Sequence, residues 1–234
     1  WKSLLKTIGF TGSISLAQVF FAMAAAYGLA CFRFPGRRIL YVFVFLTLIV
    51  PPQTIILPLY LYFQSFDIGG VFQAITGEPL SLMGSPVTLF LMAATGLGLK
   101  NGLLIFIFRQ FFKGIPRELE ESACIDGAGV IKTFGMIVLP SALPMILTGF
   151  LFTFVWQWTD GFYTSIFLPG NTLLARQLQM LVSQASSSGE MVNSYAVSLM
   201  NNAGILLFVA PILLLYLVCQ RHFIESIERT GLVG

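Results

Sequence analysis

The chain has few charges and few of the side chains on which enzymes depend. Only 10% of its 234 residues are charged, and there is a single histidine. No Cys/His/carboxylate cluster has the spacing of a metal site, no GxxxxGK[ST] phosphate-binding loop occurs, and no pattern indicates a catalytic triad. The sequence therefore predicts a protein that is not an enzyme by itself and holds no metal or cofactor. Any ATP hydrolysis that its work needs must take place in another chain.

Cysteine and net charge are also scarce. The three cysteines, Cys31, Cys124 and Cys219, show no CxxC spacing and lie in segments that we expect on the cytoplasmic side, so disulfide bonds are not expected. The net charge of +3, from 13 Lys and Arg against 10 Asp and Glu, is too weak and too scattered for a nucleic-acid surface.

Apolar residues are abundant and occur in long runs. The chain is 56% hydrophobic and has 23 phenylalanines, which indicates a membrane protein. A helix needs about 20 apolar residues to cross the hydrocarbon layer. Five segments qualify: Leu5–Ala30, Ile39–Phe63, Val87–Phe108, Leu143–Leu168 and Tyr195–Val218. They are apolar on every side and too long for barrel strands, so we predict an all-α, polytopic transmembrane helix bundle, with residues 1–234 as one domain.

The basic residues predict the orientation, because short cytoplasmic loops collect Lys and Arg. They gather after the first, third and fifth spans: Arg33, Arg37 and Arg38; Arg109, Lys113, Arg117 and Lys132; Arg221 and Arg229. We therefore expect the C-terminus in the cytoplasm and Trp1 outside. Lys2 and Lys6 oppose this orientation, an objection that a further helix upstream would remove.

Several polar or helix-breaking residues fall inside the spans. Pro51, Pro52 and Pro58 predict either a packed kink or a hinge in the second span. A buried charge or amide in a span marks either a substrate pathway or a structural contact. The pathway candidates are Lys100, Asn101, Trp156, Gln157, Asn201 and Asn202. The alternatives are a snorkelling or helix-capping lysine, tryptophans at the membrane interface, and asparagines that join helices.

The segment from Pro116 to Pro140 is too polar to span. Pro116 favours a helix start, the glutamates that follow suit the first turns of a helix, and Gly127 suits a helix end. A second helix is expected from about Gly129 to Leu139. The resulting helix–turn–helix either lies on the lipid headgroups or docks onto a partner.

The same segment resembles the EAA loop of the membrane subunits of binding-protein-dependent ABC importers. The resemblance rests on Glu121-Ser122-Ala123, then Gly127 after three intervening residues, and Ile137-Val138-Leu139-Pro140 after nine more; Ser122 replaces the usual second alanine. Asp126 beside Gly127, RFPGR at residues 33–37 and RQFF at residues 109–112 resemble the carbohydrate-uptake branch, and above all its MalG-like permeases. Such permeases usually have one more N-terminal helix, so six spans are expected in the full protein.

This resemblance implies a mechanism and partners. The loop at about residues 113–140 would be a coupling helix that inserts into a cytoplasmic ATPase, with Glu121 as the acidic contact and Gly127 as the turn. The coupling residues would be Glu121, Ser122, Ala123, Asp126, Gly127, Leu139 and Pro140. The partners would be a second homologous permease, two ATPase subunits that bind ATP and Mg²⁺, and an extracellular solute-binding protein, in a prokaryotic plasma membrane.

The expected cargo is a sugar or oligosaccharide. Two alternatives are the same machine carrying another solute and an ion-coupled secondary transporter, which the lack of a clear mid-membrane carboxylate disfavours. A scaffold subunit that docks an ATPase without conducting solute is a third.

Overall fold

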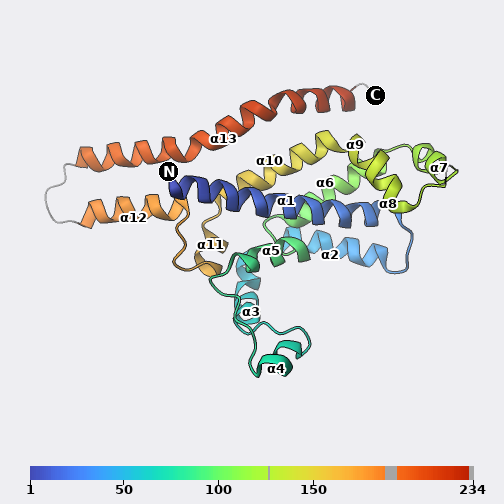
Figure 1. The fold of residues 1–234 in the computed structure, drawn as a ribbon. Helices are drawn as coiled ribbons and strands as arrows, with labels where there is room; N and C mark the ends of the chain where they lie inside the picture. Colours follow the sequence, from blue (N-terminus) through green and yellow to red (C-terminus); the bar gives the residue numbers. More distant parts are fainter. Residues whose placement is uncertain (126, 188–193, 232–234) are drawn as a thin grey trace. The chain divides into compact units, whose positions relative to one another are not determined.

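The computed structural model describes residues 1–125, 127–187 and 194–231. Within these ranges it describes only the backbone of residues 76, 117, 119, 120, 124, 182, 184–187, 194–196 and 221–231. These residues form helices and no strand beyond one antiparallel bridge between Phe66 and Leu80 (Figure 1). The all-α prediction is confirmed. The elements are α1 (Lys2–Cys31), α2 (Arg37–Ile49), α3 (Pro52–Gln64), α4 (Val71–Thr76), α5 (Pro86–Thr95), α6 (Asn101–Gly114), α7 (Arg117–Ile125), α8 (Val130–Thr133), the π-helix η1 (Phe134–Val138), α9 (Leu139–Ser141), α10 (Leu143–Thr159), α11 (Phe162–Phe167), α12 (Leu174–Ser187) and α13 (Ser194–Gly231).

Two of the predicted spans are long, unbroken helices. α1 and the Val197–Gln220 part of α13 are each long and apolar enough to cross a membrane. Within the described residues the number rises to four if each of two bent pairs, α2 with α3 and Val130–Ser141 with α10, forms one span. The count of five stays a prediction.

The third predicted span is not one helix, because the chain leaves the helical conformation between α5 and α6. Gly96 has φ +86°, and Lys100, with φ 50°, stands at the N-cap of α6. Buried side chains bond the carbonyls that the break exposes. Gln18 Nε2 donates to Leu99 O at 2.7 Å, and Asn101 Nδ2 donates to Ala93 O at 3.1 Å. This bonding compensates for the lost helical hydrogen bonds.

The fourth predicted span is also interrupted, between α10 and α11. The Asp160 carboxylate accepts backbone N–H bonds from Tyr163 at 3.2 Å and from Thr164 at 2.9 Å. These two bonds satisfy N–H groups of a new helix start. The expectation of one helix through residue 168 is therefore wrong, because a capping side chain starts a second helix there.

The second predicted span consists of two helices, α2 and α3, with Pro51 and Pro52 at the point where one ends and the other begins. Val50 N donates to Leu46 O at 2.9 Å at the end of α2, and Pro52 opens α3, a position that suits a residue without an N–H. Pro58 lies inside α3. The prolines therefore bend this segment, as predicted, but they divide it into two helices; a hinge role stays a prediction.

The chain divides into two compact units, which we describe separately. Unit 1 comprises residues 1–14, 52–91 and 154–218, and unit 2 comprises residues 15–51, 92–153 and 219–234.

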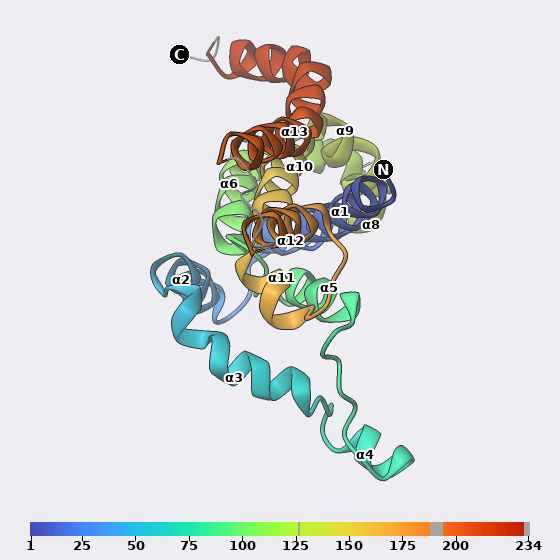
Figure 2. The same cartoon turned by 90° about the vertical axis from the view of Figure 1, so that its left-hand side faces the viewer.

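In unit 1, the start of α12 lies beside the start of α1 (Figures 1 and 2). Leu174 N donates to Thr7 Oγ1 at 2.9 Å. At the end of α10, the indole Nε1 of the buried Trp158 donates to Phe208 O on α13 at 3.0 Å. These contacts join residues that are far apart in the sequence around one site.

Unit 2 has a core of apolar side chains from α1, α6 and the segment that leads into α10. Its fully buried members include Ala26, Leu104, Phe108, Val138 and Ala142. Two glycines allow helices to approach closely. A Cβ on Gly149 would lie 2.7 Å from Phe108 Cζ, and one on Gly102 would lie 2.8 Å from Val44 O and overlap Thr47. Small residues at helix contacts are typical of membrane bundles.

Candidate functional site

The turn between α7 and α8 has the geometry that the sequence predicts. α7 begins directly after Pro116, and Gly127 adopts the left-handed conformation with φ +76°. Ala128 N donates to Ala123 O at 2.9 Å, the bond that closes a helix when a left-handed residue follows its last turn. The helix–turn–helix is thus confirmed as a capped element, which we call the α7–α8 turn (residues 117–125 and 127–133).

The surface of the α7–α8 turn combines acidic and apolar side chains. Glu118 and Glu121 are exposed, and Ile125 and Ile131 are 87% and 89% exposed. Two nearly bare isoleucines beside carboxylates fit either predicted contact, a partner protein or the lipid headgroups. Of the remaining predicted coupling residues, Ser122 is exposed and donates Oγ–H to Glu118 O at 2.7 Å.

The other predicted coupling residues differ in how far they are exposed. Ala123 is buried, with 6% of its surface exposed, whereas Leu139 and Pro140 lie at the surface in α9. Asp126 lies outside the described residues. The second helix of the predicted pair is present, but its middle part is the π-helix η1, which ends two residues before Pro140. Proline lacks the N–H that would bond the carbonyl four residues earlier, and the wider turn accommodates that loss.

Unit 1 contains a polar pocket of about 420 Å³. Its lining combines hydroxyls, amides, one carboxylate, one guanidinium and an indole. The residues are Thr7, Thr11, Gln157, Trp158, Asp160, Gly161, Thr164, Ser165, Asn171, Leu173, Ala175, Arg176, Gln179, Met180 and Ser183. A concave site with a few polar groups around an aromatic side chain is what a small polar ligand requires.

Several polar groups of the pocket are held by the backbone. Thr7 Oγ1 donates to Ser3 O at 2.7 Å, and Thr164 Oγ1 donates to Asp160 O at 2.8 Å. Asn171 Nδ2 donates to Leu168 O at 2.9 Å. These bonds fix the walls of the pocket. On α12, the half-buried Arg176 and the exposed Gln179 make no side-chain hydrogen bond with other described residues, so their donors are available to a ligand.

The predicted pathway residues do not all come together. Gln157 lines the polar pocket and is 6% exposed, whereas the half-buried Trp156 before it does not line the pocket. Asn101 is buried and bonded to Ala93 O at the α5–α6 break. Their role in a pathway stays a prediction.

The remaining pathway candidates are exposed. Lys100 caps α6, in agreement with the helix-capping alternative, and its side chain is exposed. Asn201 and Asn202 lie exposed on α13. None of these three lines the polar pocket.

Sequence reasoning missed the contribution of α1 to the polar pocket. The sequence did contain a signal of a polar face on α1, because Thr7, Thr11, Ser15 and Gln18 are spaced at helical intervals in an apolar span. All four side chains are buried in the structure. Asp160 was missed because it lies between two helices without a motif, and Arg176 and Gln179 were missed because α12 lies outside the five predicted spans.

Comparisons with known proteins agree with this architecture. Residues 18–227 match the family described as "Binding-protein-dependent transport system inner membrane component". The chain is 28% identical over 236 residues to the alpha-glucoside transport system permease protein AglG of Rhizobium meliloti, covering 100% of this chain and 57% of AglG. It is 29% identical over 215 residues to the sn-glycerol-3-phosphate transport system permease protein UgpE of Yersinia enterocolitica, covering 92% of this chain and 68% of UgpE.

The fold has a counterpart among solved structures. A chain of a bacterial ABC transporter involved in the import of the acidic polysaccharide alginate superposes with a TM-score of 0.66 at 21% identity, covering 95% of this chain and 75% of that chain. At this identity the likeness concerns the fold alone. The family match extends over most of the sequence. The chain therefore belongs to the inner membrane components of binding-protein-dependent transport systems, and it is a membrane permease of an ABC importer.

Proposed function

We propose that this permease translocates a sugar or oligosaccharide that an extracellular solute-binding protein delivers. The observation that carries the proposal is the polar pocket of unit 1, where Arg176 and Gln179 present guanidinium and amide donors that no described residue uses. Sugar hydroxyls pair with such groups. The name of AglG, an alpha-glucoside permease, supports the same cargo class.

The force for transport is supplied by other chains in this proposal. Two cytoplasmic ATPase subunits bind ATP and Mg²⁺ and receive the α7–α8 turn, while a second homologous permease completes the pathway. The exposed Glu118, Glu121, Ile125 and Ile131 support this docking role. A capped helical element transmits a rigid-body push, whereas an extended loop absorbs it. The C-terminus and the α7–α8 turn accordingly lie on the cytoplasmic side of a prokaryotic inner membrane.

A phosphorylated polyol is the second candidate cargo. UgpE is named for sn-glycerol-3-phosphate, and Arg176 places a cation in the polar pocket. A guanidinium binds a phosphate through two parallel hydrogen bonds. The two cargo classes differ in charge and can be separated directly.

The decisive experiment uses the complete assembly in lipid vesicles with its binding protein. Neutral alpha-glucosides and glycerol-3-phosphate are offered separately, and ATP turnover and solute uptake are both measured. We expect neutral glycosides to stimulate both. Stimulation by glycerol-3-phosphate alone would favour the second cargo, and uptake driven by an ion gradient without ATP would refute the ABC mechanism.

A matched pair of substitutions on α12 tests the polar pocket itself. Gln179 lines the pocket, whereas Gln177 on the same helix does not. At saturating loaded binding protein, Gln179→Ala is expected to lower glycoside uptake about two- to tenfold, the worth of one hydrogen bond. Gln177→Ala should leave uptake unchanged. Equal uptake in the two variants would show that solute does not pass Gln179.

A further inference from the structure

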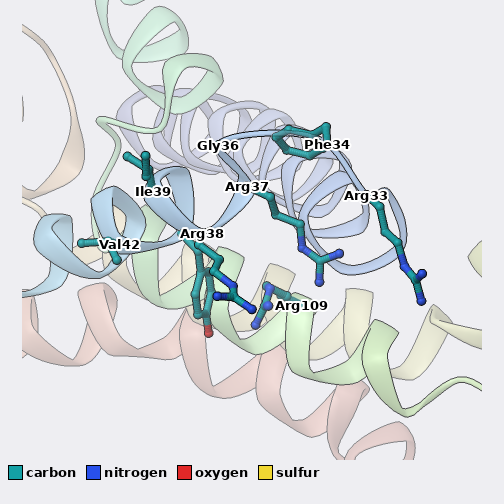
Figure 3. A pocket seen from close by; sticks show the side chains of 9 residues that line it. Arg33, Phe34, Gly36, Arg37, Arg38, Ile39, Val42 and Arg109 are labelled. Atoms are coloured by element: carbon teal, nitrogen blue, oxygen red, sulfur yellow. The ribbon is translucent and has the colours of Figure 1, made fainter.

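Unit 2 contains a second cavity, of about 830 Å³, whose lining is dominated by arginine (Figure 3). Its residues are Arg33, Phe34, Gly36, Arg37, Arg38, Ile39, Tyr41, Val42 and Arg109, and we call it the arginine pocket. None of these nine described residues carries a carboxylate. Four guanidinium groups without an acidic partner in the lining create a strongly positive site, which calls for an anion.

Arg109 is the fixed cation of the arginine pocket. It is only 7% exposed, its Nε donates to Leu29 O at 3.2 Å, and its Cζ lies 3.7 Å from the centre of the Tyr41 ring. Among the described residues its two terminal nitrogens have no hydrogen-bond acceptor. A buried guanidinium held at one nitrogen and over one ring therefore offers two donor groups to a ligand.

The start of α2 strengthens the same positive site. Arg37 Nη1 donates to Phe32 O at 2.9 Å, and Arg38 is exposed without a hydrogen bond to another described residue. Figure 3 shows the side chains of Arg37, Arg38 and Arg109 on the same side of α2. Gly36 gives α2 no side-chain cap, so the first-turn N–H groups and the helix dipole add further positive potential.

The other wall of the arginine pocket is apolar. Ile39 and Val42, which line it, are 62% and 56% exposed, and none of the residues of α2 is buried. Arg38 and Val42 are one helical turn apart, so the apolar wall begins directly beside the basic end. A free inorganic anion would use only the arginines, whereas a lipid would cover both walls.

We propose that the arginine pocket binds the phosphate headgroup of an anionic phospholipid, whose acyl chains lie against Ile39 and Val42. Three guanidinium groups and the first turn of α2 hold the phosphate, and the apolar side chains of α2 contact the hydrocarbon. Basic pockets beside membrane helices bind acidic headgroups for this reason. The site is separate from the polar pocket and does not depend on which solute is carried.

Native mass spectrometry of the complete assembly in neutral detergent tests this site. Phosphatidylglycerol and phosphatidylcholine are titrated separately, and bound lipid is counted. The test variant is Arg38→Gln, and the matched control is Lys113→Gln, an exposed cation at the end of α6 outside the pocket. We expect Arg38→Gln to weaken phosphatidylglycerol binding about fivefold and Lys113→Gln to change it by less than about twofold. Phosphatidylcholine binding should stay the same in both variants.

Three results would overturn the proposal. Unchanged phosphatidylglycerol binding in Arg38→Gln would mean that another subunit covers the pocket or that no lipid enters it. Equal losses in Arg38→Gln and Lys113→Gln would indicate diffuse surface charge. Complete displacement of phosphatidylglycerol by millimolar inorganic phosphate would make the ligand a free anion and not a lipid.

Discussion

Gly127 fixes the conformation of the α7–α8 turn at the scale of a single residue. Its φ of +76° is one that residues with a Cβ rarely adopt, although a Cβ there would meet no neighbouring atom. Gly127→Leu should therefore destabilise the turn by about 1–2 kcal/mol through backbone strain alone. The expected outcome is reduced coupling of ATP turnover to solute uptake in vesicles.

Two control variants separate backbone strain from side-chain bulk at this turn. Gly129, with φ −72°, is equally open, so Gly129→Leu adds the same bulk without strain and should preserve coupling. Gly127→Asn should retain more coupling than Gly127→Leu, because asparagine tolerates the left-handed conformation. Full coupling in Gly127→Leu would mean that the turn transmits no force.

Glu121 is the exposed carboxylate that we expect to contact the ATPase. Glu121→Lys reverses its charge, and a like-charge contact across an interface costs several kcal/mol, so ATPase retention during purification should fall at least about tenfold. Glu121→Gln should cause a smaller loss. Glu78→Lys, the same reversal in a loop predicted to be extracellular, serves as the control. Normal ATPase retention in Glu121→Lys would remove Glu121 from the interface.

At the scale of elements, the contact between α2 and α6 depends on Gly102. An added Cβ would overlap Thr47 and lie 2.8 Å from the backbone oxygen of Val44, which cannot move away as a side chain does. Gly102→Ala should therefore separate the two helices and cost about 1–3 kcal/mol. The measurement is the temperature at which the detergent-solubilised protein aggregates.

A glycine at the other end of α6 provides the control for this prediction. A Cβ on Gly114 would meet no atom within 4 Å, so Gly114→Ala should leave the aggregation temperature unchanged or raise it slightly, since alanine favours helix. Equal aggregation temperatures for the two variants would show that α2 and α6 do not pack closely in the membrane.

At the scale of the whole molecule, the basic loops predict that the α7–α8 turn faces the cytoplasm. Single cysteines at Ser122 and Ser81, both exposed, are placed in a chain whose native Cys31, Cys124 and Cys219 have been replaced and which is expressed without the ATPase subunits. In right-side-out vesicles, a membrane-impermeant maleimide should label the residue 81 position at once and the residue 122 position only after permeabilisation. The reverse pattern would place the α7–α8 turn outside, where no ATPase reaches it.

The sequence predicted those features that depend on residues close together in the chain. The start of α7 after Pro116 and its end at Gly127 were correct, because a helix cap is a contact among about six consecutive residues. The break at Lys100 was only one of the alternatives for that residue, and the break at Asp160 was not predicted. Their bonds involve Gln18, far away in the sequence, and a carboxylate in a loop without a motif.

The sequence by itself thus determined the membrane class, the family and the capped turn. The tertiary structure alone decided which polar residues meet. It brings Thr7 beside Arg176 in the polar pocket and Arg109 beside Arg38 in the arginine pocket. The two residues of each pair lie far apart in the sequence, and no helical spacing in the sequence predicts that they meet. Their proximity follows from how apolar helix faces pack against each other, a property of the folded chain and not of any local segment.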